Sequence, residues 1–283
     1  MNCSAILRRK LITLAESYVE NNHLEQHVYR SSGNPAVVLF RPYVVEGELR
    51  HGNFHQPSYA EIRKHTCWHQ RLFKRHTKVR ELQPQARELD SCTSSDALLM
   101  NIFCHPSIVE NARVAQLFGF PAMPMPCFGF KARLPKKHGG TETPSTEVDM
   151  VLFGAVGQPP RWGKAFVESK LTEKDFTREP RSTVEQYRDF REVFNSNRLP
   201  VANGKYKHYQ LIRNVLAAHY HNASFHLIYY DGRDDLLAAF GEVNEAVILN
   251  DLRGRCHAIT WQKIAGVLGP SLRDFLRTKY GID

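Results

Sequence analysis

The chain has 283 residues, of which 42% are apolar, so it can bury a core as one large domain or two smaller ones and is not expected to stay disordered. Its net charge of +9 favours a polyanionic partner, because lysine and arginine gain affinity by releasing counterions from phosphates. No apolar run is long enough to span a bilayer, and the N-terminus predicts an amphipathic helix rather than a signal peptide. The six cysteines are scattered and form no C-x-x-C pair, which is typical of reduced thiols in a cytoplasmic protein that has no membrane partner.

The first part of the chain predicts a mostly helical N-terminal extension. An opening helix covers residues 1–22, and a strongly basic helix runs from Ser58 to about Leu82, with a short strand and turn between them. Residues 83–95 are rich in small polar side chains and contain a proline, so they predict a junction. We therefore divide the chain into an extension over residues 1–90 and a second part over residues 91–283.

The second part predicts helices followed by an antiparallel meander of three strands. A helix over residues 94–103 is capped by Ser94 or Ser95, and another covers residues 105–120. The three strands cover residues 126–134, 147–154 and 164–171. Beyond them the pattern predicts helices over 182–197 and 207–222, a strand over 224–232, and two C-terminal helices that begin after Thr260 and at Pro270. Residues 244–252 suit a helix or a strand equally well.

Three charged residues fall in the meander. Successive strand residues point to opposite faces, so Glu168 and Lys170 share one face while Ser169 points away. If the second and third strands pair as a hairpin, Asp149 comes alongside Glu168. Two such carboxylates repel one another unless they share a divalent cation, and Mg²⁺ accepts one or two carboxylates while keeping several waters. A lysine beside this site can orient a water and stabilise charge on a phosphate, so the sequence predicts phosphodiester hydrolysis.

This pattern, a helix, a strand with aspartate and a strand with Glu-x-Lys, resembles the PD-(D/E)XK superfamily of restriction-endonuclease-like nucleases. The segments "SSDALLMNIF", "ESKLTEKDF", "YQLIRNVLAA", "FHLIYY" and "ITWQKIAGVLG" are similar to a bacterial branch of such proteins. The resemblance runs from about Trp68 to the C-terminus and is best after Asp149. It implies an α/β (α+β) fold, with a central mixed sheet flanked by helices, and a metal-dependent nuclease activity in residues 91–283.

The resemblance also implies roles for individual residues. Asp149 matches the family's aspartate, although Val148 stands where the signature has proline, and Glu168 and Lys170 match the E-x-K half. Asp149, Glu168 and the backbone carbonyl of Ser169 are then the metal ligands, with Mg²⁺ as the cofactor and Mn²⁺ as a substitute.

Accessory residues are less clearly marked. Glu110 is the best-placed acid on the preceding helix, and Gln186 (with Tyr187 or Phe190) competes with Gln210 (with Arg213) for the family's glutamine position. Glu147 shares a face with Asp149 and could assist, whereas Glu173 is expected to lie beyond the site.

Two basic regions are candidates for binding nucleic acid. The segment from Arg63 to Arg80 interleaves basic residues with Trp68 and Phe73, which suits phosphate contacts and base stacking, but a solvated helix face explains it equally well. The second group lies closer to the proposed site and consists of Lys131, Arg133, Lys136, Lys137 and Arg213.

Other interpretations are weaker. Cys67 and His69 are too closely spaced for a structural zinc site, which favours a basic helix with a buried cysteine and tryptophan. The charges around Glu168 could also be a solvated strand surface. We expect a cytoplasmic, prokaryotic, Mg²⁺-dependent deoxyribonuclease. The family resemblance favours an endonuclease over an exonuclease. The alternative is a non-catalytic nucleic-acid-binding or assembly subunit, and a homodimer or a larger protein assembly stays open.

Overall fold

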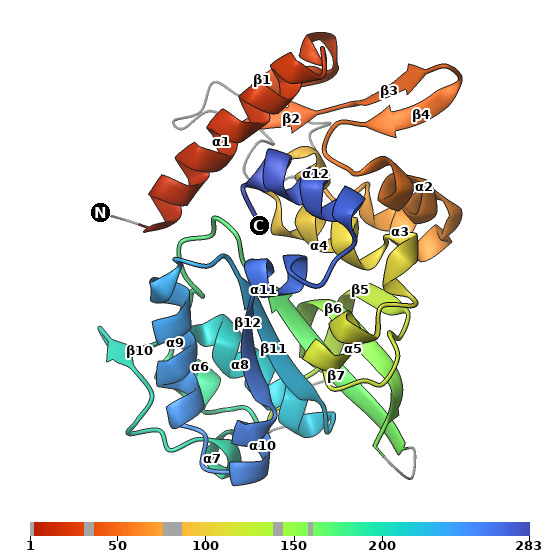
Figure 1. Ribbon diagram of the computed structural model, residues 1–283. Helices are drawn as coiled ribbons and strands as arrows, with labels where there is room; N and C mark the ends of the chain where they lie inside the picture. The colour runs from red at the N-terminus through yellow and green to blue at the C-terminus, as the bar shows by residue number, and fades with distance from the viewer. Residues whose placement is uncertain (1–2, 31–36, 76–86, 138–143, 158–160) are drawn as a thin grey trace.

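The centre of the fold is a five-stranded mixed sheet in the order β12-β11-β7-β6-β5 (Figure 1). The computed structural model describes residues 3–30, 37–75, 87–137, 144–157 and 161–283. β5, β6 and β7 form the predicted antiparallel meander, and β11 and β12 continue the sheet parallel to β7. The strands of this sheet are β5 (Pro126–Arg133), β6 (Ser145–Val156), β7 (Arg161–Ser169), β11 (Ser224–Tyr229) and β12 (Cys256–Thr260).

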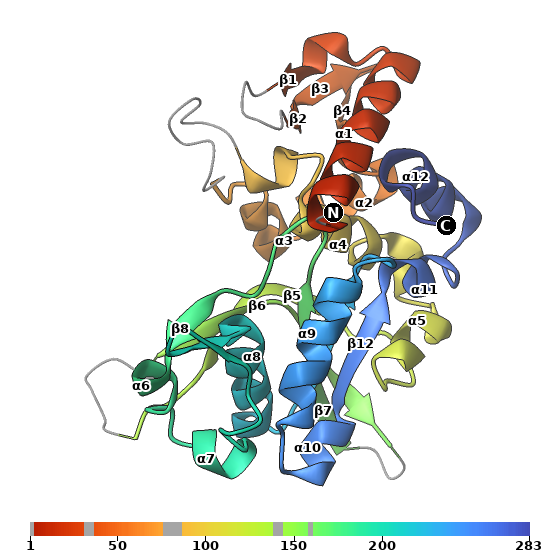
Figure 2. The same cartoon turned by 90° about the vertical axis from the view of Figure 1, so that its left-hand side faces the viewer.

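Helices cover both faces of this sheet, which confirms the predicted fold class (Figure 2). One face packs on α6 (Arg181–Val184), α7 (Phe190–Val193), α8 (Tyr209–Tyr220), α9 (Asp234–Glu245) and α10 (Asn250–Gly254). The other face packs on α4 (Ser95–Phe103), α5 (Ala112–Leu117), α11 (Trp261–Ala265), α12 (Pro270–Tyr280) and the first turns of α1 (Cys3–Asn21). Because β11 is covered on both sides, its residues from Phe225 onward are all buried, as parallel strands of such sheets usually are.

Helix α1 has the amphipathic pattern that the sequence predicts. Its buried apolar residues recur at intervals of four, so they form one stripe along the helix. This stripe lies against α12 from the other end of the chain (Figure 1). The N-terminal and C-terminal segments therefore close the fold together.

The N-terminal extension contains more strand than predicted. Two small antiparallel sheets, β1–β2 and β3–β4, lie between α1 and the helices α2 and α3. A third small sheet consists of β8, which precedes α6, and of β9 and β10, which lie between α7 and α8 in the chain. The remaining elements are η1 (Glu25–His27), β1 (Val28–Arg30), β2 (Val38–Phe40), β3 (Pro42–Val45), β4 (Glu48–His51), α2 (Gln56–Lys64), α3 (Thr66–Arg71), η2 (Glu88–Asp90), η3 (Pro106–Ile108), β8 (Arg178–Pro180), β9 (Val201–Ala202) and β10 (Lys205–Lys207).

Three helices that the periodicity predicts as continuous are interrupted. The basic helix divides into α2 and α3, and residues 76–86 at its predicted end lie outside the described part of the chain. The helix over residues 105–120 divides into η3 and α5, because the Asn111 side chain accepts a hydrogen bond from the Val114 amide and so caps a new helix. The helix over 182–197 divides into α6 and α7, because Tyr187 pairs its backbone with Lys136 instead. Residues 244–252 end α9 and begin α10, while β12 and most of α9 went unpredicted.

Two expectations about the whole chain can be compared with the structure. All six cysteines are free thiols, as predicted. No helix in the described residues is both long enough and apolar enough to cross a membrane.

A fully buried lysine lies where α12 meets the N-terminal sheets. Lys279 is 1% exposed, its Nζ donates to the Gly52 carbonyl at 2.8 Å, and the same atom lies 3.4 Å from the centre of the Phe40 ring. Burial lowers the pKa of Lys279 well below its usual value. No carboxylate is paired with it among the described residues. The lysine must therefore lose its proton when the chain folds, and this deprotonation costs free energy at neutral pH.

We predict that Lys279→Met raises the free energy of unfolding at pH 7 by about 1–3 kcal/mol. At pH values below the normal lysine pKa, the unfolded chain keeps Lys279 protonated, whereas the folded chain protonates it less readily. The extra stability of the methionine variant should therefore shrink as the pH approaches 10. Urea unfolding of both proteins at pH 7 and pH 10 measures this, with Lys263→Met on the exposed side of α11 as the control. A variant less stable than wild type at pH 7 would mean that the contacts of the ammonium outweigh its burial.

Candidate active site

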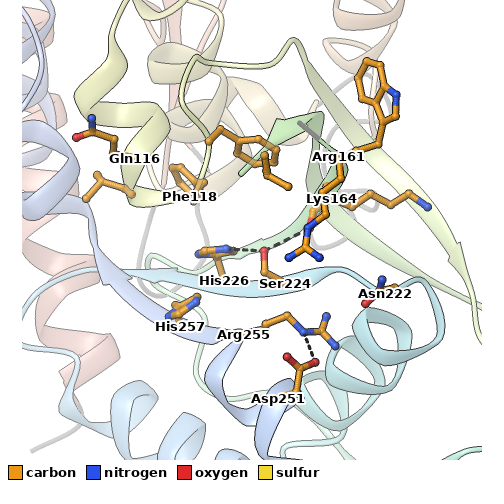
Figure 3. A pocket seen from close by; sticks show the side chains of 16 residues that line it. Gln116, Phe118, Arg161, Lys164, Asn222, Ser224, His226, Asp251, Arg255 and His257 are labelled. Atoms are coloured by element: carbon orange, nitrogen blue, oxygen red, sulfur yellow. Dashed lines mark hydrogen bonds and ion pairs between the residues drawn. The ribbon is translucent and has the colours of Figure 1, made fainter. Parts of the chain in front are cut away.

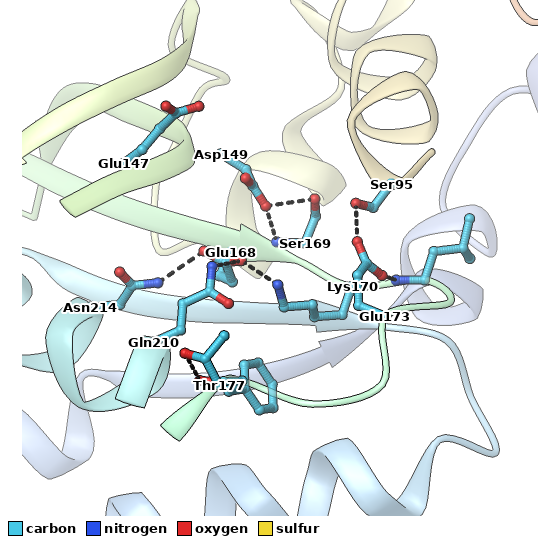
Figure 4. A network of polar contacts seen from close by, with 12 residues as sticks. Ser95, Glu147, Asp149, Glu168, Ser169, Lys170, Glu173, Thr177, Gln210 and Asn214 are labelled. Atoms are coloured by element: carbon cyan, nitrogen blue, oxygen red, sulfur yellow. Dashed lines mark hydrogen bonds and ion pairs between the residues drawn. The ribbon is translucent and has the colours of Figure 1, made fainter. Parts of the chain in front are cut away.

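The two carboxylates predicted to act together lie at the same end of the sheet. β6 and β7 pair Met150 with Val167, and one further step along both strands sets Asp149 opposite Glu168. Figure 4 shows both side chains beside the end of β7. Asp149 Oδ2 accepts hydrogen bonds from the Ser169 amide at 2.7 Å and from the Ser169 hydroxyl at 2.9 Å. The acid of β6 is therefore fastened to the strand that carries Glu168.

The side chains of strand β6 switch from one face of the sheet to the other at Asp149. Thr146 and Val148 pack toward α8, whereas Met150 and Leu152 pack on the opposite face of the sheet. In a regular strand these four residues would all point the same way. The strand must therefore rotate between Val148 and Met150, which turns the Asp149 side chain toward the end of β7.

Glu168 is buried, and both of its carboxylate oxygens accept hydrogen bonds from neighbouring side chains. Its Oε1 accepts from Lys170 Nζ at 2.8 Å and from Gln210 Nε2 at 2.6 Å, and its Oε2 accepts from Asn214 Nδ2 at 2.9 Å. Gln210 and Asn214 lie one turn apart on α8, so both reach the same strand. The Asn214 carbonyl oxygen accepts from the Thr146 hydroxyl at 3.0 Å, which fixes the amide with its nitrogen toward Glu168.

Both acids at this site are difficult to ionise. Burial raises the pKa of Asp149 well above its usual value, and the charges of Glu168 and Asp96 raise it further, while Lys170 opposes them. Burial also raises the pKa of Glu168, although Lys170 offsets part of that effect. Both acids are thus held where a second negative charge is unfavourable, and a proton or a cation would relieve the repulsion.

Lys170 remains an ammonium in this setting. Burial lowers its pKa, but the carboxylates of Glu168, Glu173 and Asp149 outweigh burial, so the net shift is upward. A lysine held in this way is suited to donating hydrogen bonds and to balancing negative charge, and it is poorly suited to accepting a proton.

Glu173 belongs to this group of charges, and the expectation that it lies beyond the site is wrong. Its Oε2 accepts from the Leu171 amide at 2.7 Å, and its Oε1 accepts from the Ser95 hydroxyl at 2.8 Å. The chain turns sharply after β7, which brings the carboxylate back toward Lys170. Glu173 thereby links the end of β7 to the first turn of α4.

Side chains from distant parts of the sequence hold the backbone that follows β7. The four carbonyls of residues 170–173 all accept hydrogen bonds from side chains. Trp261 Nε1 donates to the first carbonyl at 3.0 Å, and Ser4 Oγ donates to the third at 2.6 Å. Arg233, which is 1% exposed, donates to the second at 2.8 Å and to the fourth at 2.7 Å. The position of Lys170 and Glu173 therefore depends on α1, α11 and the start of α9.

A second ion cluster adjoins Asp149 and was not foreseen. Asp96, buried in the first turn of α4, accepts from Arg71 Nη2 at 2.8 Å and from Lys74 Nζ at 2.9 Å. Arg71 Nη1 also donates to Glu147 Oε1 at 2.8 Å. Burial alone would raise the pKa of Asp96, but the two cations hold it below its usual value. Two residues of the basic segment thus face the site. The available sequence signal for Asp96 was an acid in the first turn of a helix capped by Ser94.

The predicted accessory residues divide into one inside the site and two outside. Gln210 contacts Glu168, whereas Gln186 is exposed in the turn between α6 and α7. Glu110 is exposed in the turn between η3 and α5, because the helix expected to carry it is interrupted. Asp96 on α4, and not Glu110, is the acid of the preceding helices whose charge raises the pKa of Asp149. Asn214, one turn after Gln210, could have been found from helical spacing.

The predicted basic group lies along one edge of the meander. Lys131 and Arg133 are exposed on β5, where they pair with Glu147 and Ser145 of β6. Lys137 Nζ donates to the Glu185 carbonyl at 2.7 Å, and Arg213 Nη2 donates to the Ser145 carbonyl at 2.7 Å. Lys136 is half-buried beside them. The neighbouring residues 138–143 lie outside the described part of the chain.

The donors at this site fit a magnesium ion better than a transition metal. In the described part of the chain, no three His, Cys, Asp or Glu side chains gather closely enough to hold a metal by themselves. Mg²⁺ needs only one or two carboxylates, and Asp149 lies beside Glu168, whose charge raises the pKa of Asp149. Near the basic helix, Trp68 is buried as predicted, but Cys67 is exposed, so the prediction of a buried cysteine is wrong.

Gly129 leaves room for Arg71 directly across from Asp149. It lies between Phe128 and Phe130, which pair with Met150 and Val148. Its φ is +65°, and a Cβ atom there would lie 2.3 Å from Arg71 Nη1. A larger residue would therefore have to displace the guanidinium that bridges Asp96 and Glu147.

We predict that Gly129→Ala lowers the free energy of unfolding by about 1–2 kcal/mol through its positive φ, and that displacing Arg71 adds to this loss. Gly232→Ala is the matched control, because Gly232 has a φ of +83° with no atom within 4 Å of the added Cβ. Thermal unfolding should place Gly129→Ala clearly below Gly232→Ala. Equal losses in the two variants would show that the Arg71 contact is unimportant for stability.

Comparison with known proteins adds a family to this geometry. A family model described as "Restriction Endonuclease associating with ARP" matches residues 14–281. No curated protein and no solved structure matches the chain. The matched region starts at residue 14, so it also covers most of the predicted N-terminal extension. The chain therefore belongs to the family of restriction endonucleases associating with ARP.

Proposed function

We propose that this protein is a Mg²⁺-dependent nuclease that hydrolyses DNA phosphodiester bonds, acting within strands rather than from their ends. The observation that carries the proposal is the end of β7, where a buried Glu168 bonded to Lys170 lies opposite Asp149. Membership of a restriction-endonuclease family makes a nuclease the natural use of these residues. Mn²⁺ is expected to replace Mg²⁺, because both are hard cations that bind oxygen ligands.

Each residue has a role that follows from its contacts. Asp149, Glu168 and the Ser169 carbonyl would hold the metal, which when bound supplies Lewis-acid stabilisation of charge on the phosphate. Gln210 and Asn214 fix the orientation of Glu168 through the hydrogen bonds that they donate. The protonated Lys170 would orient the attacking water and balance charge on the phosphate as the bond breaks.

Basic residues beside the site are the proposed contacts to the DNA backbone. The exposed Lys131 and Arg133 on β5 lie on the strand next to β6, and they are joined by Lys136, Lys137 and Arg213. Their contacts would be to phosphates, which bind without reading sequence. The family description names ARP as an associate, so we also propose a second protein as a partner, with self-association as a further mode of assembly.

A non-catalytic nucleic-acid-binding or assembly subunit is the second candidate, and one observation favours it. Both oxygens of Glu168 are already occupied by donors, including the ammonium of Lys170. A metal would have to displace at least one of these donors before it could bind Glu168. If that exchange is too costly, the same residues form a stable buried network without activity.

Cleavage assays separate these two candidates. Plasmid and linear DNA are incubated with the purified protein in Mg²⁺ or Mn²⁺, and we expect nicked and linearised plasmid. Lys170→Ala and Asp149→Ala should each lower the rate by about 10²–10³-fold, because charge stabilisation at the phosphate is lost. Lys174→Ala, an exposed lysine four residues later, is the matched control and should cut like wild type. Intact plasmid with wild-type protein would leave the non-catalytic subunit as the function. Equal cutting by all variants would show that the cleavage does not depend on Asp149 and Lys170.

The stability of Asp149 variants tests the metal site without measuring activity. In EDTA at pH 8, we expect Asp149→Asn to be more stable than wild type by about 1 kcal/mol, or about 2–4 °C in melting temperature. Asparagine keeps an oxygen for the Ser169 hydrogen bonds but removes the charge that Glu168 and Asp96 repel. Because the pKa of Asp149 is raised, wild type loses stability as the pH rises through it, so the difference should vanish toward pH 4.

Adding Mg²⁺ should reverse the order of stability of wild type and Asp149→Asn. Millimolar Mg²⁺ is expected to raise the melting temperature of wild type but not of Asp149→Asn, since only wild type offers two charged ligands. The control Asp274→Asn changes an exposed acid on α12 and should respond to Mg²⁺ like wild type. A wild-type protein whose melting temperature ignores both Mg²⁺ and Mn²⁺ would contradict a metal site at these residues.

A further inference from the structure

A pocket of about 580 Å³ opens at the other end of the central sheet (Figure 3). Its walls are the beginnings of β7, β11 and β12 and the end of α5. Lys164 lies in one wall and precedes Glu168 by four residues on the same strand, which separates the two by about 13 Å along β7. The pocket also lies on the opposite face of the sheet, because His226 packs against Phe118 near α5 whereas Glu168 contacts α8. It is therefore distinct from the acidic site.

One arginine enters the pocket from strand β7. Gly154 on β6 faces α5, because a Cβ atom added to it would lie 3.5 Å from the ring of Phe120, which follows that helix. Arg161 pairs with Val156, two residues beyond Gly154, so its side chain lies on the same face. Figure 3 shows Arg161 reaching into the pocket from this face. It has no ion pair or hydrogen bond with any described residue, so its guanidinium is available to a ligand.

A second arginine faces the first from the start of β12. Arg255 Nε donates to Asp251 Oδ2 at 3.0 Å and Nη1 donates to the Ala223 carbonyl, which holds this guanidinium in the wall. Its Nη2 has no hydrogen-bond partner within the described part of the chain. Only β11 separates β7 from β12, so the two walls are about 10 Å apart. One ligand above β11 can therefore contact both guanidiniums.

The floor between the two arginines is held by neutral groups. His226 is 2% exposed, and its Nε2 lies 2.9 Å from the Ser224 hydroxyl, which donates to the Lys164 carbonyl at 3.3 Å. These contacts join β11 to β7 at the pocket. Burial lowers the pKa of His226 to about 3, so the ring stays neutral and adds no charge. His226 therefore shapes the floor without contacting a ligand, and the two arginines supply the positive charge.

Donors outnumber acceptors among the side chains that face the pocket. Of the described residues that line it, Asp251 supplies the one carboxylate, against the guanidiniums of Arg161 and Arg255. Asn222 and His257 also line it and are exposed, and their side chains make no hydrogen bond to a described residue. An excess of guanidinium and neutral N–H groups around a hollow suits an anion that offers several oxygen atoms.

We propose that this pocket binds a phosphate monoester, with its phosphate between Arg161 and the free Nη2 of Arg255 and with the Asn222 amide as a further donor. A phosphate monoester carries about −1.5 to −2 charges at pH 7 and three acceptor oxygens, so it complements two guanidiniums better than a carboxylate does. The volume of the pocket leaves room for the group that carries the phosphate. The monoester is either a free small molecule or the 5′-phosphorylated end of a DNA strand, since both present the same chemistry.

Calorimetric titration tests the proposal without any cleavage. The protein is titrated in EDTA and about 0.15 M NaCl with two matched pairs of ligands. One pair is ribose 5-phosphate and ribose, and the other is a short single-stranded oligonucleotide with and without a 5′ phosphate. We expect the phosphorylated member of at least one pair to bind at least about tenfold more tightly than its partner, and acetate to bind more weakly than either phosphorylated ligand. A preference within the ribose pair assigns a free small molecule, and one within the oligonucleotide pair alone assigns a DNA end.

Two charge reversals on β7 supply the second arm of the test. Arg161 and Lys164 are three residues apart on one strand, so their side chains point to opposite faces, and Lys164 Nζ lies 5.9 Å from the centre of the Phe153 ring. Arg161→Glu changes an exposed residue, so the variant should fold, and it should weaken binding of the phosphorylated ligand by at least about tenfold. Lys164→Glu makes the same change of charge on the α8 face and should weaken binding by less than about threefold, because salt screens charges that do not touch the ligand.

Three results would overturn the proposal. The first is that neither phosphorylated ligand binds more tightly than its unphosphorylated partner. The second is that acetate binds as tightly as the phosphorylated ligand, which would show a site for any anion. The third is that Arg161→Glu binds like wild type or no more weakly than Lys164→Glu, which would show that Arg161 does not contact the phosphate.

Discussion

The hydrogen bonds that hold residues 170–173 at the end of β7 are the constraint on which the candidate active site depends. These four residues leave the sheet, so their carbonyls have no strand partner, and buried carbonyls without partners cost about 1–3 kcal/mol each. Trp261, Arg233 and Ser4 supply the missing donors. Those donors come from both ends of the chain and from the segment between β11 and α9. Lys170 and Glu173 can reach Glu168 and α4 only when the whole fold is assembled.

This support allows the site to hold charges that would otherwise drive it apart. Asp149 and Glu168 are adjacent acids whose pKa is raised by burial, and the charge of Glu168 raises the pKa of Asp149 further. Lys170, Arg71 and Lys74 provide the compensating cations: the first is bonded to Glu168 on β7 and the other two to Asp96 on α4. Such an arrangement stores unfavourable energy that a bound divalent cation would release. A site of this kind trades stability for binding, which is common where function requires charge in a buried place.

The two ends of the central sheet carry different chemistry. At one end, on the α8 face, the acids gather beneath hydrogen bonds from Gln210 and Asn214. At the other end, on the α5 face, a buried histidine and two arginines line a pocket. Strand β7 connects them, with Arg161 at its beginning and Ser169 at its end. A rigid, doubly covered strand keeps the distance between the two sites fixed.

The sequence by itself determined the three-stranded meander, the helices around it and the shared face of Glu168 and Lys170, because alternation, helical periodicity and caps are local properties. Only the tertiary structure decided which distant side chains join them. Gln210 lies in the site and Gln186 does not, Asp96 lies beside Asp149 while Glu110 is exposed, and Glu173 turns back toward Lys170. Each of these depends on where a helix is interrupted or on which element supplies a hydrogen-bond donor across the fold. Such pairings are set by packing and by the need to satisfy buried polar groups, and no local pattern records them.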